Sequence, residues 1–112
     1  METPFSNFDK VLDVLLMLQD TSSDKNQLIL CACEIAERSL PRFERYFPTD
    51  ERPREALEAA RRWALDPTEN NKNAAKMAGT AASTAAHESE FYDALYAALT
   101  AAYIAKAVSI VV

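Results

Sequence analysis

The segment 47–67, FPTDERPREALEAARRWALDP, holds the residues of this chain with the most chemical character. It brings together the guanidinium groups and the indole of Arg52, Arg54, Arg61, Arg62 and Trp63. A planar guanidinium suits a fixed contact with a carboxylate, and it also attracts phosphate groups. The segment therefore either holds a helix in place through internal ion pairs or contacts a partner molecule.

Three further arginines precede this segment at helical spacing, around Pro41. With the arginines above they give the candidate partner-binding set Arg38, Arg42, Arg45, Arg52, Arg54 and Arg61. From Arg38 to Arg62 the arginines are interleaved with the acidic residues Glu44, Asp50, Glu51, Glu55 and Glu58. These acids weaken attraction to phosphates, so we rank internal salt bridges first, a protein-binding surface second and nucleic-acid contact third.

The same segment predicts a helix with a clear beginning and end. Asp50 is suited to cap the helix, Pro53 fits its first turn, and Pro67 ends it at about Asp66. Apolar residues then recur at helical spacing, with Trp63 as a core anchor alongside Ala56, Leu57 and Ala60.

The charged residues of this helix carry two more predictions. Glu58 and Arg62 are four residues apart in the order that favours a surface ion pair. We also predict that at least one of the other arginines makes a fixed carboxylate contact. The arginines in question are Arg52, Arg54 and Arg61, and the carboxylates are Asp50, Glu37 and Glu44.

Residues that could carry out catalysis or bind a metal are few. His87 is the only histidine, and the adjacent Glu88 points in another direction on a helix. Cys31 and Cys33 lie in an apolar helical run and point to different sides, which we interpret as buried or half-buried thiols in a reducing compartment. No catalytic triad, phosphate-binding glycine loop, HExxH motif or calcium loop is present. We therefore assign no catalytic residue, no metal site and no cofactor, and expect a protein that is not an enzyme.

Composition predicts a single all-helical domain over residues 1–112. The chain is 49% hydrophobic, contains one glycine, and is rich in alanine from Ala74 onward. The net charge of -5 is unevenly distributed. The first third carries Glu2, Asp9, Asp13, Asp20, Asp24, Glu34 and Glu37 against Lys10 and Lys25, ahead of the arginine-rich middle. This arrangement predicts intramolecular pairing or two faces of opposite sign, and no general affinity for nucleic acid.

Hydrophobic spacing and turn signals predict a compact bundle of about five helices. The first starts after Pro4 or Ser6, with Ser6 or Asn7 as its cap, and ends before a turn at 20–26, where residue 23 or Asp24 caps the next helix. The remaining helical segments are expected at 25–40, at 41–47 after a kink or break at Pro41, at 50–66, from 71 or 73 to about 87, and from Ser89, as the cap, to the end.

The final segment should be the central, most buried helix, because its second half has almost no polar face. Two strips of small side chains recur along it, namely Ala94, Ala98 and Ala102, and Ala97, Ala101 and Ala105. They suit close helix packing, with one exposed strip, or the side chains of Tyr92, Tyr96 and Tyr103, as an alternative homodimer face. Lys106 and the preceding acids favour a soluble core helix over a membrane span.

The longest recognisable pattern is CEIAERSLPRFERYFPTDERPREALEAARRWALDP at 33–67. It resembles the signature A-E-x-x-L-P-x-F-E-x-x-x-P-x-D-x-R-P-R-x-A-I-E-A-A-R-x-W-A of the Imm5-like putative immunity proteins of bacterial polymorphic toxin systems. The matching positions are Ala36, Glu37, Leu40, Pro41, Phe43, Glu44, Pro48, Asp50, Arg52, Pro53, Arg54, Ala56, Glu58, Ala59, Ala60, Arg61, Trp63 and Ala64. The resemblance implies a small, all-helical, cytoplasmic bacterial protein that binds and blocks a toxin.

Taken together, these features favour a non-enzymatic helical binding protein that neutralises a cognate toxin by direct contact. The alternative is a self-associating structural or regulatory protein, with the alanine strips or exposed tyrosines as its dimer surface. A weaker alternative is nucleic-acid binding through Arg38, Arg42, Arg45 and Arg54. We expect a cytoplasmic location without a signal peptide, and no membrane partner.

Overall fold

The computed structural model describes residues 3–20 and 24–110. Within these ranges the chain is almost entirely helical and contains no strand. The elements are α1 (Pro4–Leu16), the short 3-10 helix η1 (Met17–Gln19), α2 (Lys25–Tyr46), α3 (Arg52–Leu65), α4 (Glu69–Glu88) and α5 (Tyr92–Ile110). The prediction of an all-α bundle of about five helices is confirmed.

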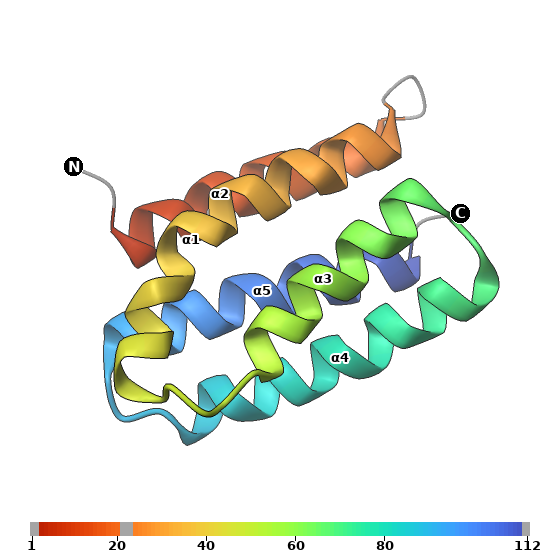
Figure 1. Ribbon diagram of the computed structural model, residues 1–112. Helices are drawn as coiled ribbons and strands as arrows, with labels where there is room; N and C mark the ends of the chain where they lie inside the picture. The colour runs from red at the N-terminus through yellow and green to blue at the C-terminus, as the bar shows by residue number, and fades with distance from the viewer. Residues whose placement is uncertain (1–2, 21–23, 111–112) are drawn as a thin grey trace.

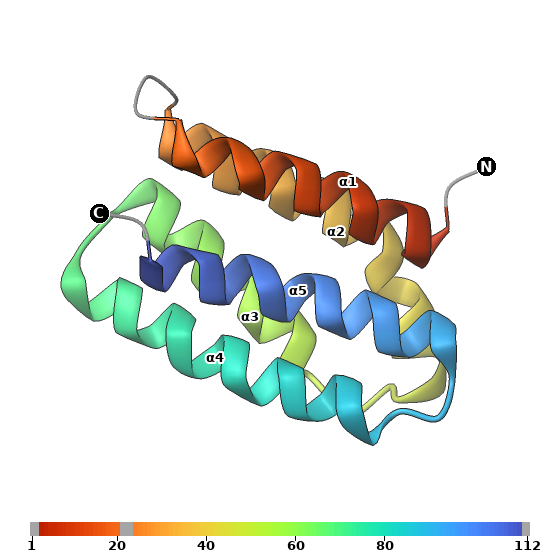
Figure 2. The same ribbon diagram turned by 180° about the vertical axis from the view of Figure 1, so that it is seen from behind.

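Helix α5 lies at the centre of the bundle and contacts all four other α-helices. Figures 1 and 2 show α1 and α2 side by side along one edge of the molecule, with α3 and α4 along the other. All six alanines of the two strips on α5 are buried inside the bundle, so the alternative of an exposed alanine strip is wrong. The alanine strips are used in packing against the four neighbouring helices and are therefore not available to a second copy.

The length and composition of α5 would also allow it to cross a membrane. Among the described residues it is the one helix that meets this criterion, and 56% of its most apolar stretch is buried inside the bundle. Its apolar side chains are therefore used in packing against neighbouring helices, as the sequence predicts for a core helix.

The ends of the helices follow local capping rules with small shifts from the predicted positions. Thr3 caps α1 through a reciprocal pair of bonds with Ser6, of 3.0 and 2.9 Å, so the prediction of Ser6 or Asn7 as the cap is wrong. Asp24 caps α2, as predicted, by accepting a 3.2 Å bond from the amide of Gln27. Residue 23, the other predicted cap, lies outside the described residues.

Helix α4 begins two residues earlier than the nearer of its predicted starts. The hydroxyl of Thr68 caps it by accepting a 3.1 Å bond from the amide of Asn71. The predicted break before the last helix is confirmed between Glu88 and Tyr92. Ser89 lies three residues before the first residue of α5 and bonds Phe91 through its hydroxyl, so it fixes the turn between the helices.

Pro41 does not divide α2 into two helices, as the sequence suggested. The helix is continuous from Lys25 to Tyr46, although its last part, yellow in Figure 1, bends away from the direction of the first. Proline removes a single backbone donor, and Phe43, two residues further on, is buried in the core. Packing of this ring favours continuation of the helix, so the predicted kink is observed but the separate helix is not.

Asp50 was predicted to cap α3, but the helix starts one residue later than a cap at Asp50 would give. Glu51 is at the cap position, and the Asp50 carboxylate instead accepts a 3.1 Å bond from the amide of Arg52. Pro53 is in the first turn and Asp66 follows the last residue, as predicted. Trp63 is buried in the core cluster that also contains Ala56, Leu57 and Ala60, which confirms its predicted role as an anchor.

Candidate protein-binding surface

Arg54, in the first turn of α3, connects this helix to α2. Its Nε and Nη2 donate to the two carboxylate oxygens of Glu44 at 2.8 and 3.0 Å. Its Nη1 donates to Oε1 of Glu37 at 2.8 Å. One guanidinium therefore bridges two carboxylates that lie seven residues apart on α2, on either side of Pro41. The hydrogen bonds raise the pKa of Arg54 above its usual value, so it stays charged.

Arg61 adds a second contact from α3 to Glu37. Its Nη1 lies 3.1 Å from Oε2 of Glu37, so the two carboxylate oxygens each face a different arginine. Partial burial raises the pKa of Glu37, but hydrogen bonds and charges from Arg54 and Arg61 outweigh it and hold the pKa below its usual value. These contacts keep Glu37 ionised and join α3 to α2 along two turns.

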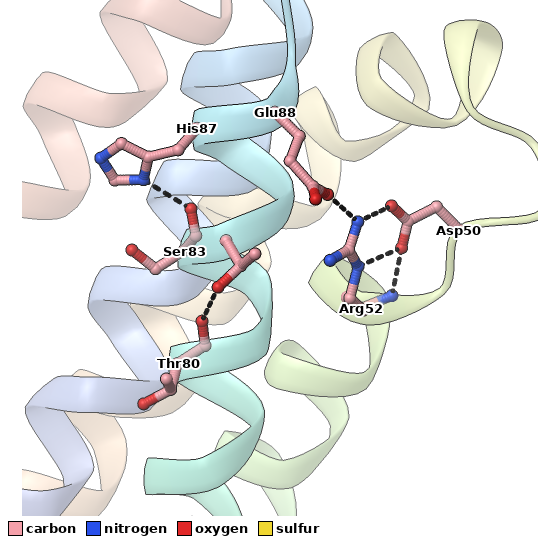
Figure 3. Close-up of polar contacts among 7 residues, drawn as sticks. Asp50, Arg52, Thr80, Ser83, His87 and Glu88 are labelled. Atoms are coloured by element: carbon pink, nitrogen blue, oxygen red, sulfur yellow. Dashed lines mark hydrogen bonds and ion pairs between the residues drawn. The ribbon is translucent and has the colours of Figure 1, made fainter.

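Arg52 makes a separate contact at the start of α3, shown in Figure 3. Its Nε and Nη2 donate to the Asp50 carboxylate at 2.9 and 2.7 Å, and Nη2 also donates to Glu88 at 2.6 Å. These bonds lower the pKa of Asp50, chiefly through the side-chain hydrogen bonds from Arg52. The cluster joins the loop between α2 and α3 to the end of α4.

The prediction that at least one of Arg52, Arg54 and Arg61 binds a carboxylate is confirmed for all three. The predicted pair between Glu58 and Arg62 is wrong, because both side chains are exposed and no ion pair joins these two residues. A lysine ammonium can also contact two carboxylates, but it has no planar pair of donors to fix the direction of either contact. The planar fork of arginine supplies such a pair, and the acidic and basic thirds of the sequence meet here.

The other three candidate arginines lie on the second half of α2. Arg42 forms a 3.2 Å ion pair with Asp93 on α5, and both side chains are largely exposed. Arg45 is exposed and has no carboxylate within ion-pair distance among the described residues, and Arg38 is exposed about two turns earlier. Arg42 and Arg45 are thus near the end of the bundle where α2 ends and α5 begins (Figure 1).

Aromatic side chains cover this same end of the bundle. The rings of Tyr46 and Phe91 stack with centroids 4.2 Å apart and planes within 10° of parallel, and Phe47 and Phe43 continue the row into the core. Tyr46 and Phe91 are 42% and 47% exposed, and Tyr92 is 79% exposed. We call Tyr46, Phe91, Tyr92, Arg42 and Arg45 the aromatic surface.

Tyr46 and Phe91 were not among the residues predicted to form a site, although their positions in the chain carry one signal. Both lie directly beside a helix end, where a large ring has fewer neighbours to cover it. Phe91 belongs to the break between α4 and α5, and Tyr46 is the last residue of α2. The two rings are in contact although the residues lie 45 positions apart in the chain. Helical periodicity does not predict contacts over such a separation.

The remaining titratable residues do not form a reactive group with one another. His87 is exposed, and its Nδ1 donates to the carbonyl of Ser83 at 2.7 Å, while Glu88 extends to Arg52 on another side of α4 (Figure 3). Among the described residues no group of three or more histidine, cysteine, aspartate or glutamate side chains is arranged to hold a metal ion.

The two cysteines differ in their surroundings. Cys33 is buried, its Sγ lies 3.9 Å from the carbonyl of Leu57, and burial raises its pKa to about 12. Cys31 is exposed, so the prediction that both thiols are buried or half-buried is wrong for this residue. A spacing of two on a helix rotates one thiol to the core and the other towards solvent.

Comparison with protein families identifies the group to which these features belong. The model of the family described as Imm-5 like putative immunity protein matches residues 19–111, which include both arginine–carboxylate clusters and the aromatic surface. The chain belongs to this family. The resemblance inferred from the segment 33–67 is therefore confirmed over most of the chain. No curated protein and no solved structure matches this Imm-5 like chain.

Proposed function

We propose that this Imm-5 like protein is a non-enzymatic binding protein that neutralises a cognate toxin in the bacterial cytoplasm by direct contact. Membership of an immunity-protein family supports a protein partner. The described arginines and carboxylates are paired with one another or exposed at the surface, and they surround no reacting centre. This arrangement agrees with a binding role. Such a protein needs a surface that a partner recognises.

The aromatic surface supplies that contact. Tyrosine and arginine are enriched at the centres of protein interfaces, where a large ring buries much area at little cost in side-chain entropy. Tyr92 is 79% exposed and directly follows Phe91, which is also exposed and stacks on the exposed ring of Tyr46; this group of exposed rings is the observation that carries the proposal. Arg42, which pairs with Asp93 directly after Tyr92, and Arg45, directly before Tyr46 in the chain, provide charge for selecting the partner.

The internal arginine clusters act indirectly in this proposal. Arg54 joins α3 to the end of α2, which carries Tyr46, and Arg52 joins α3 to the end of α4, just before the turn that contains Phe91. They therefore preorganise the surface, so that little conformational entropy is lost on binding. Arg38 and Arg61 remain candidates for contact with the edge of a large partner.

The test is capture of the partner from the source bacterium by the tagged protein, followed by direct binding measurements with the products of neighbouring genes. Tyr92→Ala should weaken binding by at least about tenfold, a typical loss for an interface hot spot. Leu65→Ala removes a side chain of similar exposure, 76%, at the far end of α3, and should bind normally. Failure to capture any neighbouring gene product, or equal binding by both variants, would refute the proposal.

Self-association is the second candidate function. Tyr103 is 40% exposed, whereas Tyr96 is half-buried between the rings of Phe5 and Phe8 at 5.1 and 5.4 Å. Tyr92 and Tyr103 are therefore the tyrosines available to a dimer. Light scattering that gives the mass of one chain, 12.5 kDa, at high concentration would exclude this candidate.

The weaker alternative is nucleic-acid binding. It predicts a salt-dependent affinity for nucleic acid that Arg45→Glu abolishes.

A further inference from the structure

An open groove lies beside α5 on one face of the molecule, and Figure 2 shows α5 from this side, between α1 and α4. Helices α1 and α4 lie on either side of α5 and make no contact with each other. A cavity of about 470 Å³ lies between them towards the C-terminal end of α5. Its apolar lining includes Leu15 and Leu18 on one side and Tyr103, Ala107 and Ile110 on the floor. This volume is within the range of protein binding sites.

The charged residues that line the groove are two lysines. Lys76 on α4 and Lys106 on α5 border the cavity, and no carboxylate lies within ion-pair distance of either among the described residues. The chain as a whole carries a net charge of -5. Two ammonium groups that have no carboxylate partner in the described part of the chain therefore form a local site of opposite sign on an acidic protein.

The position of Lys106 is fixed by the closest approach of α4 and α5. A Cβ atom on Gly79 would lie 3.0 Å from Cγ of Lys106 and 3.1 Å from its backbone nitrogen. The aliphatic part of the Lys106 side chain therefore packs against α4 at Gly79, where the lack of a side chain leaves room for it. This contact orders the aliphatic part of the side chain and brings the ammonium group to the border of the groove.

We propose that this groove binds an amphipathic helix of a partner protein, with acidic residues beside its apolar stripe. From Tyr103 to Ile110 the floor extends for about 10 Å, which matches two turns of a helix with apolar residues at i, i+3 or i+4, and i+7. The acidic residues of that helix pair with Lys76 and Lys106. A helix is the expected occupant because the elements on either side of the cavity, α1 and α4, are themselves helices that pack on α5.

Charge argues against a second copy of the chain as the occupant. Two copies that each carry a net charge of -5 repel each other, whereas an acidic segment on an otherwise neutral or basic partner is attracted to the two lysines. The groove is lined by α1, α4 and the C-terminal part of α5, and the aromatic surface lies at the opposite end of α5. The inference therefore does not depend on the proposed immunity function.

The experiment uses the intact, isotope-labelled protein and two synthetic helical peptides of about 15 residues, about four turns. Both carry leucine at i, i+4, i+7 and i+11, with either glutamate or lysine flanking the stripe. Nuclear magnetic resonance should show the amide signals of Leu15, Leu18, Lys106 and Ile110 shifting with the glutamate peptide. The lysine peptide should bind at least about tenfold more weakly, a difference of about 1.4 kcal/mol.

A charge-matched pair of variants separates the groove from general electrostatics. K76E/K106E should weaken binding of the glutamate peptide at least fivefold. K10E/R62E makes the same change in net charge at exposed positions of α1 and α3 that do not line the groove, and should bind normally. Equal loss in both variants, equal binding of both peptides, no binding at millimolar concentration, or shifts only with a fatty acid would overturn the inference.

Discussion

Arg54 and Glu44 are joined by two parallel hydrogen bonds, of 2.8 Å from Nε and 3.0 Å from Nη2. This pair, with the third bond to Glu37, spans the part of α2 that contains Pro41. A proline bends a helix by removing one backbone hydrogen bond and crowding the preceding turn, and side-chain contacts on both sides of the bend can then fix its direction. The guanidinium at the start of α3 contacts one carboxylate on each side, and so fixes the direction of the last turns of α2.

Replacing this guanidinium by an ammonium group should weaken the link without removing the charge. Arg54→Lys loses the paired geometry, and we expect the free energy of unfolding to fall by about 1 kcal/mol, a value limited by the partial exposure of the three side chains. Urea denaturation measures the change. Arg62→Lys on the exposed side of α3 should alter stability by less than about 0.5 kcal/mol, and a similar loss in both variants would contradict this role.

Stability should decrease in acid because of two carboxylates. The pKa of Glu37 and that of Asp50 lie below their usual values of about 4. As the pH falls, the unfolded chain therefore binds protons at these two carboxylates before the folded chain does. The stabilisation present above about pH 4 is then lost as the pH falls through the lower pKa values of the folded chain. Unfolding free energies from pH 7 to pH 2.5 should show this loss.

A double variant isolates the two groups. E37Q/D50N should be less stable than the natural chain at pH 7 and should have a shallower dependence on pH below 4. Glu58→Gln changes an exposed carboxylate on α3 and should keep the natural slope. An unchanged slope in the double variant would show that other carboxylates govern acid unfolding.

The two thiols should react at very different rates. Cys31 is exposed, whereas Cys33 is buried and its pKa is raised to about 12. A thiol reagent at pH 8 should label one cysteine per native chain quickly and the second only in denaturant, because the thiolate is the reactive form. Cys31→Ser should leave no rapidly reacting thiol. Rapid labelling of that variant in its native state would place Cys33 at the surface.

Gly79 should be needed for the close packing of α4 and α5. An alanine at this position favours helix formation by about 0.5 to 1 kcal/mol, but overpacking costs about 1 to 3 kcal/mol. The added methyl meets the backbone nitrogen of Lys106 and Cβ of Ala105 at 3.1 Å, and these atoms cannot rotate away. The steric cost therefore wins, and Gly79→Ala should lower the thermal midpoint. Asn73→Ala, exposed on the same helix, should not.

Much of this fold was predictable because its determinants are local. Proline and aspartate positions mark the limits of α3, and helical spacing marks Trp63 as a core residue. The planar guanidinium groups of Arg52, Arg54 and Arg61 also predicted a fixed carboxylate contact, and the named acids Asp50, Glu37 and Glu44 are the ones that provide it. The alanine strips similarly indicated that α5 is surrounded by other helices, because close packing suits small side chains.

The parts that escaped prediction depend on contacts distant in sequence. Glu88, the second carboxylate on Arg52, is 36 residues away, and Asp93, the partner of Arg42, is 51 residues away. Pro41 is a further example. Its missing backbone donor predicted a kink or a break in the helix, whereas burial of Phe43 in the core favoured continuation of the helix. Sequence pattern reports which face of a helix is apolar, but not which ends of different helices meet.

The stacked rings of Tyr46 and Phe91 should couple the turn between α4 and α5 to the end of α2. Removing either ring exposes the other, so Tyr46→Ala and Phe91→Ala should each reduce stability, and a double-mutant cycle should give a coupling energy of about 0.5 to 1.5 kcal/mol. Tyr92→Ala should change stability by less than about 0.5 kcal/mol, because its ring is 79% exposed.

This difference separates the structural part of the aromatic surface from the part available to a partner. If Tyr92 contributes only to partner binding and not to stability, Tyr92→Ala should reduce the affinity for the partner and leave the thermal midpoint unchanged. Loss of Phe91 should reduce both, since it also loosens the turn that leads into Tyr92 and Asp93. A coupling energy near zero between Tyr46 and Phe91 would mean that the turn is held without the ring pair. The orientation of Tyr92 would then depend on Ser89 and the ion pair of Arg42 with Asp93 instead.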